Sequence, residues 1–373
     1  MLKTVSPNGK FPLTSLLALV LAGTPAFGDP ATDAAAVTAS SGTNGAQTAS
    51  LPPAPTARVA QYRGDRAAAI SYTFDDGTHD QLQVVPLLNA HGFHGTFLII
   101  ASHVPDTEAQ VAARHMRSWG SISWEKLREM QAEGHEMSNH SWSHPHLSSL
   151  NDADMRAEIE KADQLMAEKL GAPPLTFCYP WNDFNDRVRA VVLEHHVNDR
   201  TVCVGLSGPT FTQDFANKWV DGLIHDHGWG VTMIHQVSKQ VVEKVDLSDE
   251  LSLHTEATNL NVLNGQMDYV KSHNDAVWVD TFLNVSLYTK EQAAAKLAVT
   301  STGDHKADVL LTCSLDPTLY HYPLTVVVAL PGVTQASATQ GISSIPLILG
   351  KDSVQVDVVP GIEPTSVTWT DGK

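Results

Sequence analysis

Two aspartates stand next to one another, as Asp75 and Asp76, in the segment S-Y-T-F-D-D-G-T-H-D. Adjacent side chains at the end of a strand point in different directions, so one carboxylate can bind a metal ion while the other stays free as a base. A D-D-G sequence is also common in ordinary turns. The pair therefore marks a candidate site without yet defining a reaction.

Two histidines, His140 and His144, lie four residues apart in G-H-E-M-S-N-H-S-W-S-H-P-H-L. Imidazoles at this spacing can converge on one divalent ion. With Asp76 they make a set of two histidines and one carboxylate, which leaves coordination positions open for water and substrate. His135 and His146 flank the pair, and polar surface loops can carry several histidines without a metal. An open set of this kind suits catalysis.

A further histidine, His235, ends the segment T-M-I-H-Q, where another strand is expected. An imidazole at a strand end can donate a proton to a leaving group. The alternative is a histidine packed at the end of its strand. The nearby H-D-H of residues 225–227 is interpreted as surface histidines at a helix end rather than as a second metal site.

In this order, T-F-D-D-G, H-S-x-x-H and a strand-end histidine resemble the chitooligosaccharide and peptidoglycan deacetylases of carbohydrate esterase family four. The resemblance extends over about residues 66–288 and includes the late segment H-N-D-A-V-W-V-D-T-F-L-N-V. Members of that family fold as a distorted (β/α) barrel with fewer than eight strands. The resemblance implies hydrolytic deacetylation of an acetylated polysaccharide or oligosaccharide, with an N-acetylglucosamine-type amide favoured and an O-acetyl ester as the alternative.

The resemblance also implies a role for each residue. Asp76, His140 and His144 match the metal ligands, with Zn²⁺ expected and Co²⁺ or another divalent transition metal as alternatives. Asp75 matches the base that deprotonates the attacking water. His235 matches the acid that protonates the departing amine or alkoxide.

The segment F-C-Y-P-W-N matches the third motif of the family, but Cys178 occupies a position where an arginine commonly orients the catalytic aspartate. The arginine is missing from this motif. The backbone N–H of Trp181 is the expected oxyanion donor, and its indole offers a face on which a sugar can stack. Alternatively, Tyr179 and Trp181 are core aromatics.

The resemblance further implies a carboxylate that pairs with His235. Three aspartates lie in the right stretch: Asp214, Asp221 and Asp226. We single out Asp214.

Alternating hydrophobic runs and amphipathic stretches specify the elements that must position these residues. Strands are expected over 68–74, 95–100, 135–138, 176–179, 201–205, 231–235 and 276–279, and helices over 81–90, 124–133, 152–170, 185–195, 214–225 and 262–272. Asn151 is a suitable N-cap for the long helix that begins at Asp152. This rhythm predicts an α/β fold, a distorted (β/α) barrel with about seven parallel strands.

The domain organisation follows from shifts in composition. Residues 1–28 are predicted to be a secretory signal peptide, and residues 29–60 an Ala, Thr, Ser and Pro-rich linker without a fold of its own. The deacetylase-like domain is expected over 61–294. The remaining residues, 295–373, are rich in β-forming segments and predict a small C-terminal β-sandwich.

Composition narrows the class of protein. The chain has 373 residues, 42% of them hydrophobic, which is enough for a packed core. A formal charge of −17 disfavours nucleic acid as a partner, and no segment after the first 28 residues is long and apolar enough to span a membrane. Export to the periplasm or the extracellular space is expected. There are three cysteines, and one bridge between Cys178 and Cys203 is an option.

Two other functions compete with deacetylation. One is a catalytically silent carbohydrate-binding protein that retains the fold and binds through its sandwich. The other is hydrolysis of a small cyclic amide. The presence of both Asp75 and His235 favours an enzyme, whereas export and a trailing sandwich favour a polymer substrate.

Overall fold

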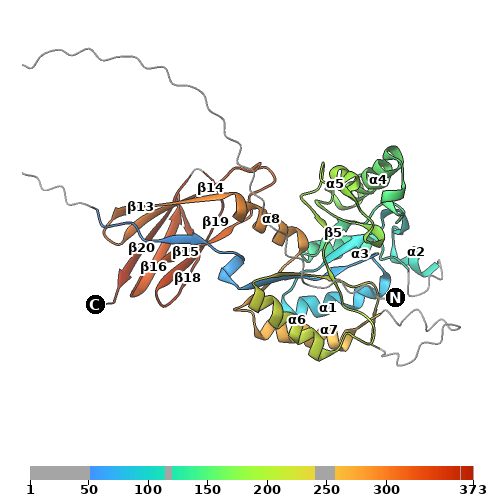
Figure 1. Ribbon diagram of the computed structural model, residues 1–373, viewed down its shortest axis with the longest axis horizontal. Helices are drawn as coiled ribbons and strands as arrows, with labels where there is room; N and C mark the ends of the chain where they lie inside the picture. Colours follow the sequence, from blue (N-terminus) through green and yellow to red (C-terminus); the bar gives the residue numbers. More distant parts are fainter. Residues whose placement is uncertain (1–50, 114–119, 240–256, 362, 373) are drawn as a thin grey trace, which may run out of the picture. The chain divides into compact units, whose positions relative to one another are not determined.

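The computed structural model describes residues 51–113, 120–239, 257–361 and 363–372 (Figure 1). The predicted signal peptide and most of the predicted linker lie outside these residues. From residue 68 to 294, short parallel strands alternate with helices, and antiparallel strands follow. None of the described helices is long and apolar enough to cross a bilayer.

Most of the parallel strands form two sheets, and β10 and β11 (Val237–Ser238 and Thr258–Asn259) pair as a separate two-stranded sheet. A half-barrel of five strands has the order β3-β4-β5-β6-β7, and a second sheet of four strands has the order β12-β2-β9-β8. The chain passes from β2 to β3 through Tyr72, and a bridge between Phe74 and Ile234 joins the sheets. Their bounds are β2 Ala68–Ser71, β3 Thr73–Phe74, β4 Thr96–Ile99, β5 Glu136–Asn139, β6 Thr176–Cys178, β7 Asn198–Arg200, β8 Val204–Gly205, β9 Trp229–Met233 and β12 Val277–Val279.

The expected count of about seven strands is not confirmed, for two local reasons. The predicted strand over 68–74 divides at Tyr72 and contributes to both sheets. The predicted strand over 201–205 is replaced by β7, which starts three residues earlier, and by the two-residue β8. Apolar periodicity does not resolve strands this short.

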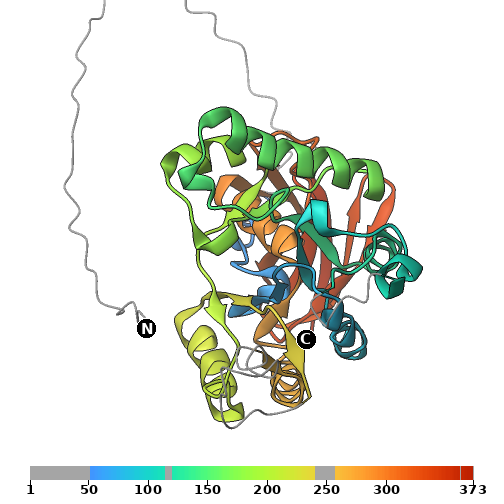
Figure 2. The same cartoon turned by 90° about the vertical axis from the view of Figure 1, so that its right-hand side faces the viewer.

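Helices cover the strands on two sides. In Figure 2, α4 and α5 lie opposite the pair α6 and α7. The side chain of Asn151 accepts a hydrogen bond from the N–H of Asp154, which confirms the predicted N-cap of α4. The helices are α1 Val85–His91, α2 Glu108–Ala113, α3 Trp124–Ala132, α4 Asp152–Leu170, α5 Asp186–Val192, α6 Gln213–Asp226, α7 Leu260–Ser272 and α8 Phe282–Ala294.

The strands after α8, together with β1 (Ala57–Val59), form two antiparallel sheets, of order β1-β15-β19-β18 and β13-β14-β20-β16-β17. In β19, Val354, Val356 and Val358 are buried and alternate with partly exposed residues, as expected for a sheet with one face in a core. The remaining bounds are β10 Val237–Ser238, β11 Thr258–Asn259, β13 Ala295–Gly303, β14 Lys306–Cys313, β15 Leu324–Ala329, β16 Val333–Gln340, β17 Ser343–Ile345, β18 Leu347–Leu349, β19 Ser353–Val358 and β20 Thr365–Asp371.

One segment differs from the expectation of an unfolded linker up to residue 60. Ala57–Val59 forms β1, which pairs antiparallel with β15 over Val326–Val328. A strand of three residues has too few positions to show a periodic pattern. Its order comes from hydrogen bonds to a partner more than 260 residues away in the sequence.

One buried apolar cluster contains residues from both the parallel strands and the antiparallel sheets. Trp278 of β12 and Tyr288 of α8 belong to the same buried cluster as the valines of β15 and β19. The Tyr288 hydroxyl donates to the carbonyl of Ala60 at 2.9 Å.

Candidate active site

The residues singled out in the sequence follow the carboxyl ends of neighbouring parallel strands. Asp75 follows β3, His140 follows β5, and His235 lies two residues after β9. Phe74 is bridged to Ile234, and the N–H of Asp75 donates to the Ile234 carbonyl at 2.7 Å. Because parallel strands end at one edge, side chains from distant parts of the sequence meet there.

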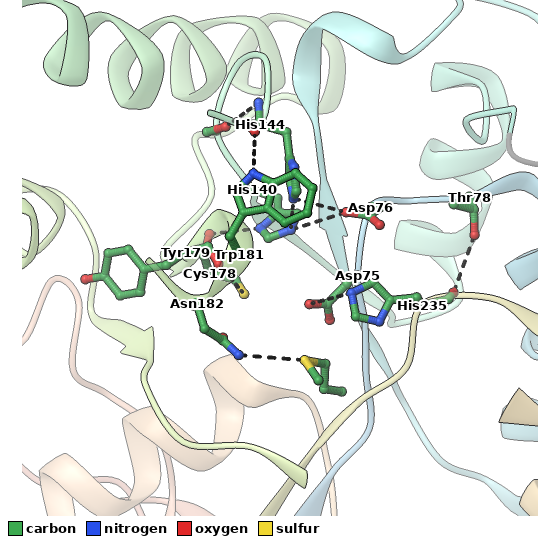
Figure 3. A network of polar contacts seen from close by, with 12 residues as sticks. Asp75, Asp76, Thr78, His140, His144, Cys178, Tyr179, Trp181, Asn182 and His235 are labelled. Atoms are coloured by element: carbon green, nitrogen blue, oxygen red, sulfur yellow. Dashed lines mark hydrogen bonds and ion pairs between the residues drawn. The ribbon is translucent and has the colours of Figure 1, made fainter. Parts of the chain in front are cut away.

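Three ligand atoms form a small triangle at this edge (Figure 3). The two Nε2 atoms of His140 and His144 are 3.2 Å apart, and each is 3.4 Å from Oδ1 of Asp76. Ligands bound tetrahedrally to Zn²⁺ at about 2.0–2.1 Å are separated by roughly 3.3–3.4 Å. The separations in the triangle thus match those of ligands around one tetrahedral divalent metal ion.

An oxygen that accepts no hydrogen bond within the described part of the chain, although it lies 3.4 Å from both imidazole nitrogens, supports the same interpretation. Oδ1 of Asp76 is buried and accepts no hydrogen bond from the described residues. A buried carboxylate oxygen without a partner is costly unless a cation or a donor satisfies it. Together with the two nitrogen atoms, it fits a divalent metal ion.

The electrostatics favour the metal-binding forms of two of the three ligands, Asp76 and His144. Burial acts to raise the pKa of Asp76, but His140, His235 and His144 together lower it to about 2, so the carboxylate is ionised. Burial and the neighbouring His140 lower the pKa of His144 to about 4, so its imidazole is neutral near pH 7.

Burial acts to lower the pKa of His140, but Cys178, Asp76 and Asp75 raise it well above its ordinary value, so a metal ion has to displace a proton from this ring. The Nδ1 of His140 is 2.9 Å from the carbonyl of Cys178, which orients this ring and leaves Nε2 to face the triangle.

A second group of possible ligands, Asp75, His140 and Cys178, also lies within 4.8 Å. It fits a metal less well. Both carboxylate oxygens of Asp75 accept hydrogen bonds from Arg200, and the Nε2 of His140 is already part of the first triangle. The structure therefore separates the adjacent aspartates: Asp76 faces the histidines and Asp75 faces an arginine.

The loop that carries the histidines has an uncommon backbone. Ser141 and His144 have positive φ angles of 67° and 65°. Such conformations cost about 1–3 kcal/mol each and persist only where neighbouring contacts impose them. Helix α4 supplies such contacts, because Glu158 accepts hydrogen bonds at 2.8 Å from both the N–H and the hydroxyl of Ser143.

Arg200, at the end of β7, is the residue that the sequence analysis missed. Its guanidinium donates to Oδ1 and Oδ2 of Asp75 at 2.6 and 2.5 Å. The side chain is 2% exposed, and although burial acts to lower the pKa of Arg200, Asp75 raises it above its ordinary value. An arginine at the end of the strand after Cys178 is the signal that could identify it, but the sequence pattern places the start of that strand at residue 201.

His235 faces the same carboxylate. Its Nε2 lies 4.0 Å from Oδ2 of Asp75, and Figure 3 shows the two side chains pointing toward one another. Gln81, fully buried, donates at 2.6 Å to the backbone carbonyls of both Asp75 and His235. This glutamine, which the sequence analysis also missed, ties the two strand ends together.

The expected pairing of Asp214 with His235 is wrong. Asp214 is exposed on α6 and forms an ion pair with Lys218 one helical turn away. Asp221 accepts from the hydroxyl of Tyr269, and Asp226 pairs with His225. All three aspartates lie in the expected stretch of sequence, but they are on the exposed face of α6 and not at the strand ends where His235 lies. The optional bridge between Cys178 and Cys203 is absent too, since both are free thiols.

Trp181 is 63% exposed at the edge of the site and is therefore not a core aromatic, whereas Tyr179 is buried. The Trp181 indole N–H donates to the carbonyl of His144 at 3.0 Å, and its ring stacks on His146 with centroids 5.3 Å apart. Its φ angle is 61°. The remaining indole surface is open to solvent beside the ligand triangle.

Comparison with known proteins adds a family to this geometry. Residues 63–198 match the family model described as polysaccharide deacetylase. These residues belong to the polysaccharide deacetylase family. The matched segment of this deacetylase domain contains Asp75, the ligand triangle and Trp181, whereas Arg200 and His235 lie beyond it.

Individual relatives of the deacetylase domain are distant. The gellan lyase of a Bacillus species is 24% identical over 340 residues, which is 82% of this chain but 13% of that protein. Chitin deacetylase 1 of Cryptococcus neoformans var. grubii is 37% identical over 95 residues, 26% of this chain and 20% of that protein. The chain therefore spans at most a fifth of the length of these two relatives.

Among solved structures, the peptidoglycan deacetylase PdaC from Bacillus subtilis is similar to 61% of this chain and 93% of its own, with 20% sequence identity and a TM-score of 0.39.

Proposed function

We propose that this chain is an exported, metal-dependent deacetylase that hydrolyses acetyl groups on a carbohydrate polymer or oligomer. The observation that carries the proposal is the ligand triangle, with separations of 3.2–3.4 Å, directly beside the facing pair of Asp75 and His235. Such a site has a place for a cation, a base and an acid at one strand edge. Hydrolysis of an acetyl group requires all three.

The ligand set of Asp76, His140 and His144 suits Zn²⁺, with Co²⁺ as an alternative. A divalent ion bound there would polarise the acetyl carbonyl and lower the pKa of a water molecule. The three protein ligands leave room for both.

Asp75 and His235 supply the proton transfers in the proposed reaction. The carboxylate of Asp75 is fixed by Arg200, yet each of its oxygens retains a second lone pair that can accept a proton from water. His235, 44% exposed, can reach both the site and the solvent, as a group that protonates a leaving amine or alkoxide must. The backbone N–H of Trp181 is the proposed donor to the oxyanion.

We further propose an N-acetylglucosamine-type amide as the favoured substrate group, with an O-acetyl ester as the alternative. Exposed Trp181 supports a carbohydrate, because an open indole face beside the site can stack on a pyranose ring. The proposed setting outside the cytoplasm depends on the amino-terminal sequence, with its apolar run over residues 13–22.

The test is acetate release from a panel of chitin oligomers, peptidoglycan, acetylxylan and an acetylated exopolysaccharide. The purified chain would be assayed as prepared, after chelator treatment, and after addition of Zn²⁺ or Co²⁺. We expect release from at least one glycan, its loss with chelator and its return with metal. Metal binding without acetate release from any of them would contradict the proposal.

A further inference from the structure

The strongest unassigned feature is the buried arginine opposite the motif position that lacks one. Cys178 and Arg200 are direct partners in the register of β6 and β7. Paired residues on neighbouring strands project from the same face of a sheet. Both side chains therefore start from adjacent points on the wall that faces Asp75.

The two positions reach the same carboxylate. The Sγ of Cys178 lies within 4.8 Å of one carboxylate oxygen of Asp75. The guanidinium of Arg200 donates to both carboxylate oxygens of the same residue. Cys178 is fully buried and small. A longer side chain at position 178 would enter the space beside Asp75, so one arginine fits there from either strand, but two would bring like charges together.

We propose that Arg200 is the positioning residue of the catalytic base Asp75, and that it takes over across the sheet the role that an arginine at position 178 would have. This inference rests on the proposed function. The arginine has moved by one strand while its guanidinium keeps the same target.

Contacts on the opposite wall support this assignment. The Nη1 of Arg200 also donates to the hydroxyl of Thr73 at 2.6 Å and, more weakly, to the carbonyl of Thr232 at 3.4 Å. Thr73 is in β3, the strand that ends at Asp75, whereas Arg200 is in β7 at the other edge of the five-stranded sheet. The arginine thus fixes the base from across the half-barrel.

The pair with Asp75 uses only part of the guanidinium. The Nε of Arg200 is buried without a hydrogen-bond partner among the described residues. A bidentate pair uses the two terminal nitrogens and gives the carboxylate a defined plane, which a single ammonium group does not. Orientation of the base is therefore the property that replacement by lysine should remove.

The test compares acetate release by the full chain carrying Arg200→Lys with two other variants. The matched control is Arg189→Lys, which alters the bidentate pair of Arg189 with Asp199. Asp199 precedes Arg200 in β7, so its side chain projects from the opposite face of the sheet. The relocation variant is Cys178→Arg with Arg200→Cys. Zinc content and the thermal unfolding midpoint are measured for each.

We expect Arg200→Lys to lower kcat by roughly 10- to 100-fold with KM and zinc content nearly unchanged, because a base displaced by about 1 Å costs turnover on this scale. Arg189→Lys should keep kcat within about twofold. The relocation variant should recover at least about tenfold over Arg200→Cys alone, a gain that general packing would not give.

Three outcomes would overturn the inference. The first is a kcat for folded Arg200→Lys within about twofold of that of the unchanged chain. The second is a loss of kcat in Arg189→Lys as large as that in Arg200→Lys. The third is a relocation variant that folds and binds zinc but has a kcat as low as that of Arg200→Cys. If Arg200→Lys does not fold, the relocation variant alone decides. Absence of acetate release from the unchanged chain would instead reject the proposed function.

Discussion

At the scale of single residues, two carboxylates adjacent in the chain have opposite surroundings. Asp75 is bound through both oxygens by Arg200, whereas Oδ1 of Asp76 faces two imidazole nitrogens at 3.4 Å. The φ angle of Asp76, 72°, turns the chain between them. One side chain is thereby available to move a proton, while the other is available to bind a cation.

The proton donor can be tested by its dependence on the leaving group. An amine must be protonated as it departs, whereas an activated phenolate departs without help. We expect His235→Ala to lower turnover of an N-acetylated glycan about 100-fold or more, and that of an aryl acetate by less than about tenfold. Equal losses on both substrates would contradict the role of His235 as an acid. His225→Ala, at an exposed site on α6, is the control.

At the scale of elements, the turn from α3 into β5 contains a buried histidine outside the catalytic group. His135 is 3% exposed, and its Nδ1 accepts the N–H of Gly95 at 3.1 Å. This bond requires a neutral imidazole with its proton on Nε2. Burial, assisted by the charge of His94, lowers the pKa of His135 to about 4.

This histidine predicts a pH dependence of stability. The folded-state pKa of about 4 is below the ordinary value of 6.5, so the stabilisation is present above pH 6.5 and is lost as the pH falls toward 4. Asparagine can retain an acceptor near the position of Nδ1 without titrating.

We would measure the free energy of unfolding in urea at pH 7.5 and at pH 5. Between these two pH values it should fall less for His135→Asn than for the unchanged chain. His195→Asn, at an exposed position, is the control and should behave like the unchanged chain. If the free energy of unfolding of His135→Asn falls as much between the two pH values as that of the control, His135 is not the cause of the pH dependence.

Strand ends also explain which parts of the site could be predicted from the sequence. Asp75 and His235 each follow an apolar run, and His140 follows the segment expected to be a strand over 135–138, so the chemistry of these residues and their meeting point could be inferred from the sequence. Arg200 and Gln81 were not, because Arg200 ends a three-residue strand with no apolar pattern and Gln81 acts through backbone carbonyls. Asp214 was selected by its place in the sequence, which does not show that its helix face points to solvent.

At the scale of the whole molecule, Tyr288 of α8 links the parallel strands to the C-terminal sheets. The side chain is fully buried, packs against Trp278 at a centroid distance of 5.2 Å, and donates to the carbonyl of Ala60. Its cluster includes Val326 of β15. The parallel strands β2 and β12 therefore share a core with the antiparallel strands that follow α8.

This shared core predicts a large stability effect far from the catalytic group. Removing a buried aromatic ring typically costs about 3–5 kcal/mol, so Tyr288→Ala should lower the free energy of unfolding by about that amount in urea titrations. The exposed Ile342→Ala, in the turn between β16 and β17, should change it by less than about 0.5 kcal/mol. A loss below about 1 kcal/mol for Tyr288→Ala would show that the shared cluster contributes little to stability.

We propose that the adjacent aspartates divide metal binding from proton transfer, and two quantities measured on the same variants distinguish these roles. Zinc content after dialysis and acetate release would be determined together for Asp75→Asn and Asp76→Ala, with His140→Ala as a second ligand variant. We expect Asp75→Asn to retain zinc and to lose at least about 100-fold in turnover, whereas Asp76→Ala and His140→Ala should lose zinc and activity together. Full activity in Asp75→Asn, or undiminished zinc in Asp76→Ala, would contradict this proposal.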